Sequence, residues 1–229
     1  MNWLASNPQI LFYVLLLTAL FLTRIPVLGK YFRSVNTLIH EAGHAFVTLA
    51  LSGEVIAVNL FADTSGTTVT KAKGKFASAL ISLAGYPASA LTGWLCLFLL
   101  QKGYYLYILF ILTSIAMIIM ILSLRNMYGL FWAGTFVVLN LLLVYFNNKD
   151  FIYAFSAFYS VIIFTDAVIS SFVLLILSIK QPKKAGDATN LQKATKIPAA
   201  VWATLLLAFT LFITWISVVN YFPPIKKLM

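Results

Sequence analysis

Seven long apolar runs, separated by short polar segments, dominate this chain of 229 residues. Each run has close to the roughly 20 residues that a helix needs to cross the hydrocarbon core of a bilayer. Hydrophobic residues make up 62% of the sequence, well above the roughly 45–50% usual for soluble domains. We therefore predict an all-α polytopic membrane protein with about seven transmembrane helices. The runs are 8–28, 35–51, 76–100, 104–124, 127–146, 151–179 and 198–222.

One segment of the chain changes from helical to strand character. Residues 55–61 and 67–70 are rich in β-branched side chains and flank the turn-forming residues 62–66. We predict a short β-hairpin insertion at 53–75, which is either a solvated connector or an edge strand that receives an extended peptide. A second segment, 180–197, is a basic loop. Since neither is long enough for a soluble domain, we expect 1–229 to form a single membrane domain.

The net charge of +10 is distributed over the ends of the apolar runs. It forms no continuous basic face, so we expect contacts with lipid headgroups and no nucleic-acid partner. If all seven runs cross, nine cations collect on one side and six on the other. The excess predicts that the first side and the N-terminus are cytoplasmic. We expect a multi-pass protein of the cytoplasmic membrane of a bacterium. The nine are Lys71, Lys73, Lys75, Arg125, Lys180, Lys183, Lys184, Lys193 and Lys196, and the six are Lys30, Arg33, Lys102, Lys149, Lys226 and Lys227.

The second run carries the pentad His40-Glu41-Ala42-Gly43-His44. Histidines at positions i and i+4 project from one helical face about a turn apart, which lets both bind one zinc ion. Ionised residues at the centre of a membrane helix cost roughly 2.5–3.5 kcal/mol each, so three polar groups together require a partner. A metal supplies it. We predict His40 and His44 as zinc ligands, with Glu41 placed to activate water.

A catalytic zinc ion normally has three protein ligands and an open fourth position. The chain has no third histidine, so the third ligand is expected to be acidic. We predict Asp166, because it alone lies deep within a later apolar run, where an unpaired carboxylate is unfavourable. Asp187 is the alternative, and its sequence setting also suits a helix N-cap.

Two asparagines are candidate substrate-binding residues. Asn126 follows Arg125 at the junction of two runs, where the pair could steady a substrate carbonyl or cap a helix. Asn140 could bind substrate or form an interhelical hydrogen bond. Gly43, inside the pentad, permits close approach of either a neighbouring helix or a substrate.

Taken together, these motifs resemble the site-2-protease-like family of intramembrane zinc metallopeptidases, in its compact branch without an inserted PDZ domain. The resemblance is carried by the pentad on an early helix and by segments 53–74, 84–87, 125–129, 186–191 and 197–202. It implies that His40 and His44 bind zinc and that Glu41 is the catalytic acid/base. The aspartate ligand of better-known members follows an Asn-Pro or Leu-Asp-Gly type motif, which is absent here.

We therefore expect a zinc-dependent intramembrane endopeptidase that hydrolyses peptide bonds of membrane-embedded or membrane-proximal proteins. The alternatives are a noncatalytic zinc-binding sensor or scaffold, and an ion-coupled transporter whose intramembrane His and Asp form an ion pathway. A transporter does not require Glu41 directly after the first histidine, so the pentad favours the hydrolase. The sequence does not indicate the substrate or the oligomeric state.

Overall fold

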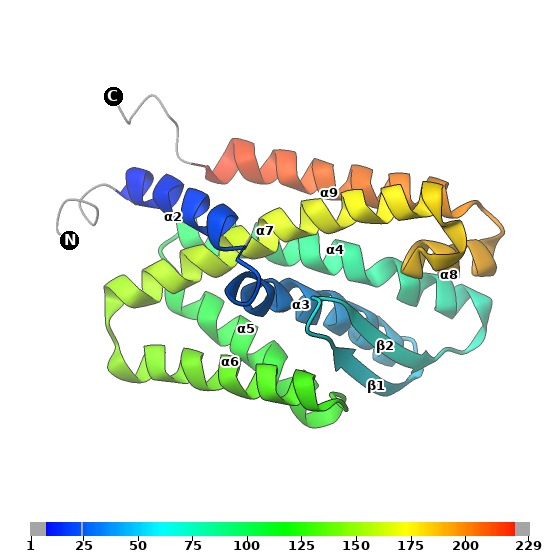
Figure 1. The fold of residues 1–229 in the computed structure, drawn as a ribbon, viewed down its shortest axis with the longest axis horizontal. Helices are drawn as coiled ribbons and strands as arrows, with labels where there is room; N and C mark the ends of the chain where they lie inside the picture. The colour runs from blue at the N-terminus through cyan, green and yellow to red at the C-terminus, as the bar shows by residue number, and fades with distance from the viewer. Residues whose placement is uncertain (1–7, 24, 223–229) are drawn as a thin grey trace.

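The computed structural model describes residues 8–23 and 25–222, which form a helical bundle with one small sheet (Figure 1). Lys226 and Lys227, which contribute to the charge asymmetry above, lie outside the described residues. In chain order the elements are α2 (Pro8–Leu22), α3 (Leu28–Ala50), β1 (Glu54–Leu60), β2 (Gly66–Lys71), α4 (Gly74–Gln101), α5 (Tyr105–Leu122), α6 (Met127–Phe146), α7 (Lys149–Lys180), η1 (Pro182–Lys184), α8 (Gly186–Thr195) and α9 (Ala199–Tyr221).

Five of the described helices, α4, α5, α6, α7 and α9, are long and apolar enough to cross a membrane. They correspond to the last five predicted runs. The count of seven is not confirmed, because α2 has only 15 residues and the 23-residue α3 carries the polar pentad. The ring centroids of Phe12 and Phe222 lie 5.1 Å apart, so the described chain begins and ends at the same end of the bundle. An odd number of complete membrane crossings would place the beginning and the end of the described chain at opposite ends of the bundle. Figure 1 shows α2 and α3 following one another toward the hairpin.

The opposite end of the bundle holds the hairpin, α8, the starts of α4, α6 and α9, and the ends of α5 and α7 (Figure 1). The nine cations that we assigned to one side of the membrane all lie on these segments. The structure gathers them at one end. Helix α2 begins at the other end (Figure 1), so the predicted placement of the N-terminus on the same side as these nine cations is wrong. That this end faces the cytoplasm stays a prediction.

Helix α3 packs against α4, α7 and the hairpin, because its apolar and polar residues lie on different faces. Val35, Leu38 and Ile39 are buried in the main hydrophobic core. Gly43 faces α4, where an added Cβ would lie 2.6 Å from the Cβ of Ala88. Of the two roles considered for this glycine, the structure supports close helix packing.

The predicted hairpin is present, with β1 and β2 paired antiparallel and a register shift between Val55 and Ala57. The outer edge of β1 is occupied. The Val58 N–H donates to Ser123 O at 2.8 Å, and the Arg125 N–H donates to Val58 O at 3.1 Å. No described strand pairs with the outer edge of β2. Because β1 is held against the connection between α5 and α6, β2 is the exposed edge of the sheet.

Candidate metal centre

Two histidines and one aspartate bring one donor atom each to a common point. His40 and His44 lie one turn apart on α3, with their Nε2 atoms separated by 3.1 Å. Asp187, at the start of α8, places its Oδ2 3.1 Å from His40 Nε2 and 3.2 Å from His44 Nε2. The donors therefore form a nearly equilateral triangle.

This triangle fits a zinc ion. Tetrahedral zinc with bonds of about 2.0–2.1 Å separates neighbouring ligand atoms by about 3.3 Å, close to all three observed distances. Two imidazoles and a carboxylate are also a donor set that zinc accepts, and three protein ligands leave a fourth position open. Among the described residues, these three form the metal-competent group of His, Cys, Asp and Glu side chains.

Helix α4 orients both imidazoles. The His44 Nδ1–H donates to the backbone oxygen of Ile81 at 2.6 Å, which leaves Nε2 with its lone pair directed at the triangle. The ring of Tyr86 packs edge-to-face on His40, with centroids 4.7 Å apart. Gly85 lies beneath both rings, and an added Cβ would come within 2.5 Å of His40 Nε2 and 2.7 Å of His44 Nε2. Only a residue without a side chain leaves the rings in place.

Helix α8 carries Asp187 to the histidines, so the prediction of a basic loop at 180–197 is wrong for most of that segment, which is helical. Its apolar side is anchored because Ala188 and Leu191 are buried in a second hydrophobic cluster against α4 and α9. The helix begins at Gly186, which adopts a positive φ of 49° that suits glycine. Burial alone would raise the pKa of Asp187, but the charge and hydrogen bonds of His44 and His40 hold that pKa well below its usual range.

Glu41 lies beside this centre and is held by the hairpin. It is 4% exposed, and its Oε2 accepts a hydrogen bond from the Thr68 hydroxyl at 2.6 Å. One turn earlier, the Thr37 hydroxyl donates to Thr64 O at 2.8 Å. Glu41, the two histidines and Asp187 all border one cavity of about 600 Å³, which is lined by residues of α3, the hairpin, α4, α7 and α8. The arrangement can hold a metal with a carboxylate next to it.

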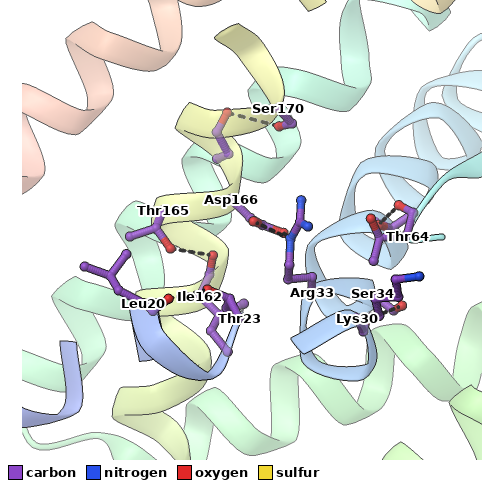
Figure 2. A network of polar contacts seen from close by, with 12 residues as sticks. Leu20, Thr23, Lys30, Arg33, Ser34, Thr64, Ile162, Thr165, Asp166 and Ser170 are labelled. Carbon is purple, nitrogen blue, oxygen red and sulfur yellow. Dashed lines mark hydrogen bonds and ion pairs between the residues drawn. The ribbon is translucent and has the colours of Figure 1, made fainter. Parts of the chain in front are cut away.

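Asp166, our preferred third ligand, does not join the histidines. In the middle of α7 its carboxylate accepts two hydrogen bonds from Arg33 Nε, at 2.9 and 3.0 Å (Figure 2). The argument that a buried carboxylate needs a cationic partner was sound, but the partner is an arginine of α3. The geometry corrects our preference in favour of the alternative, Asp187.

The two asparagines also lie away from the metal centre. Asn126 Oδ1 accepts from the Leu60 N–H at 3.1 Å and Asn126 Nδ2 donates to Leu60 O, so this side chain fastens the outer edge of β1. Asn140 is 1% exposed, and its amide atoms have no hydrogen-bond partner among the described residues. Neither borders the cavity. Their predicted roles in substrate binding gain no support from this placement.

Sequence reasoning missed two contributors to the site, Thr68 and Tyr86, and it also missed Arg33, which pairs with Asp166 outside the site. Thr68 and Tyr86 gave no signal of their own, because threonine in a strand and tyrosine in an apolar helix are ordinary. Arg33 did give one. It lies seven residues before His40, on the same helical face, and this spacing could have marked it as a partner for a buried carboxylate.

Comparison with known proteins identifies a relationship over most of the chain. A family model described as Peptidase M50B-like matches residues 13–217. Searches of curated proteins and of solved structures gave no match. The matched range contains α3, the hairpin and α8, and therefore every residue of the metal centre.

Proposed function

Because the chain belongs to the Peptidase M50B-like family, which is the site-2-protease family, we propose that it is a zinc-dependent endopeptidase of membrane-embedded or membrane-proximal proteins. One observation carries this proposal. The donor atoms of His40, His44 and Asp187 lie 3.1–3.2 Å from one another, beside the buried carboxylate of Glu41.

We assign His40, His44 and Asp187 as the zinc ligands. Bound zinc would supply Lewis acidity, polarising the scissile carbonyl and lowering the pKa of water at the open fourth position. The surrounding chain would hold the ligands for it. The Ile81 carbonyl selects the tautomer of His44, and Tyr86 limits rotation of the His40 ring.

Glu41 is the proposed general base and acid. A carboxylate bordering the same cavity as the zinc ligands can take a proton from water and return it to the leaving amine. Residues of four helices and of the hairpin line the cavity. The polar residues needed for hydrolysis are thus collected inside an otherwise apolar bundle.

The outer edge of β2 is the proposed docking site for the substrate. A transmembrane helix must unwind before cleavage, because its backbone carbonyls are already hydrogen-bonded within the helix. Strand β2 borders the cavity and has no strand partner among the described residues on its outer edge. An extended peptide could therefore add to it through main-chain hydrogen bonds, next to Glu41. This placement favours the edge-strand interpretation of the hairpin over a solvated connector.

The five membrane-length helices support a lipid environment, from which such substrates would enter. We propose a multi-pass location in the cytoplasmic membrane of a bacterium, with the cation-rich end cytoplasmic. In this arrangement the hairpin and α8 lie toward the cytoplasmic end of the bundle (Figure 1).

The test combines metal analysis with cleavage of a membrane-peptide library by purified protein. We expect one zinc ion per chain and cleavage by the wild type. Glu41→Gln should retain zinc and lose cleavage, whereas the matched change Glu54→Gln, at an exposed acid in β1, should alter neither. A noncatalytic zinc sensor would keep its function in Glu41→Gln. A transporter would instead move ions across proteoliposomes without cleaving the library.

A further inference from the structure

We propose that Thr68 is a positioning residue for Glu41, which fixes the orientation of the glutamate and ties it to edge strand β2. This inference rests on the proposed function of Glu41. It concerns a residue of the hairpin, whereas the pentad and the metal ligands lie on α3 and α8. Thr68 acts through Glu41 and is not assigned any contact with substrate.

The inner face of β2 is unusual for a strand that packs on a helix. Alternate residues face α3, and these are the half-buried Gly66, Thr68 and Thr70, while the intervening residues are exposed. The apolar contribution of the sheet comes from β1, where Val58 and Leu60 are fully buried. The inner face of β2 thus offers small or hydroxyl-bearing residues where it meets the polar site.

Both oxygens of the Glu41 carboxylate border β2. Oε2 accepts the Thr68 hydroxyl at 2.6 Å, a short hydrogen bond to an acceptor that is charged when ionised. Oε1 lies over Gly66, where an added Cβ would approach it to 2.6 Å. Because Oε2 is engaged by Thr68, Oε1 remains to exchange a proton with water. The hydroxyl therefore determines which oxygen is available.

A second contact sets the register between the hairpin and α3. Thr37 precedes Glu41 by one helical turn, and its hydroxyl donates to Thr64 O. Thr37 and Glu41 are four residues apart on α3, and their partners Thr64 and Thr68 are four residues apart on the hairpin. The hairpin is consequently held along the same face of α3 that presents Glu41. An extended peptide that adds to the outer edge of β2 would bind the strand that orients the general base.

The first experiment compares three variants of the full-length protein with a cleavable membrane peptide. Thr68→Val keeps the β-branched shape and removes the hydroxyl, so we expect kcat to fall by about tenfold or more at unchanged KM and zinc content. Thr68→Ser restores the donor and should recover kcat to within about twofold of the wild type. Thr204→Val, at an exposed position of α9 that does not border the cavity, should leave both constants unchanged. A failure of serine to rescue, or an effect confined to KM, would overturn the positioning role.

The second experiment needs no turnover. Acetohydroxamate chelates zinc and shares its acidic proton with a nearby carboxylate, so its affinity reports the placement of Glu41. We expect Thr68→Val to weaken binding about tenfold in the wild-type background and to have no effect in Glu41→Gln. Equal effects in both backgrounds would overturn the proposal. If the zinc-loaded wild type binds the hydroxamate but cleaves nothing, the proposed peptidase function fails. The comparison of Thr68→Val in the two backgrounds still decides the role of Thr68.

Discussion

A single methyl group at Gly85 should weaken zinc binding by more than about 100-fold while leaving the fold nearly intact. In Gly85→Ala the new Cβ would lie 2.5 Å from His40 Nε2 and Cε1 and 2.7 Å from His44 Nε2. An ordinary van der Waals contact begins at 3.4 Å, so the rings must retreat by about 0.7–0.9 Å. Zinc sites tolerate changes in ligand distance of only about 0.2 Å. The substitution therefore displaces two ligands at once.

The cost to the fold should be small, because side-chain rings can move where backbone cannot. Overpacking costs about 1–3 kcal/mol, and replacing a helical glycine by alanine returns nearly 1 kcal/mol through helix propensity. The cost to the site should be large. Loss of a residue that merely supports a ligand weakens metal binding by about 10–100-fold, so displacing both histidines should exceed about 100-fold.

The assay is a zinc titration in detergent against a chelating dye, together with a thermal melt of the metal-free protein. Gly134→Ala is the matched control, since an added Cβ there meets nothing within 4 Å. It should bind zinc like the wild type. If Gly85→Ala also bound zinc with wild-type affinity at an unchanged melting temperature, the argued closeness of α4 to the two imidazoles would be refuted.

Further substitutions separate the two buried aspartates and test the hairpin. Asp187→Asn should lose most of the bound zinc, whereas Asp166→Asn should keep it; retention of zinc by Asp187→Asn would contradict the ligand assignment. Asp166→Asn should instead lower the free energy of unfolding by about 1–3 kcal/mol, measured as a lower melting temperature, because Arg33 loses its carboxylate partner. Because the Arg33 side chain is 33% exposed and solvent screens the ion pair, we expect a loss of stability near the lower limit of this range. Asn126→Ala should speed hydrogen exchange at the Leu60 amide without changing zinc affinity, as measured by mass spectrometry; unaltered exchange would show that this side chain does not fasten β1.

The last five helices and the hairpin could be predicted because each depends on local pattern. Run length fixes the membrane helices, and the change to β-branched residues around a turn fixes the hairpin. The first two runs could not be interpreted in this way. Helix α3 is polar because it lies among α4, α7 and the hairpin, and this shielding is a tertiary property that run length does not report.

The third ligand shows the same limit within the site. Asp166 and Asp187 were both plausible, and the reasoning from burial preferred Asp166. Its partner Arg33 lies 133 residues away in sequence, so the pairing depends on how α3 packs on α7. Asp187 reaches His40 across 147 residues through the packing of α8 on α4 and α9. The paired histidines were predictable because four residues on one helix set their separation.

X-ray absorption at the zinc K-edge of the purified protein tests the central claim most directly. The account predicts one zinc ion per chain, with two imidazole nitrogens and a carboxylate oxygen at about 2.0–2.2 Å and a further light-atom ligand. Replacing His44 by alanine should remove that spectrum. Absence of stoichiometric zinc, or a spectrum that is unchanged in His44→Ala, would contradict the proposed metal centre.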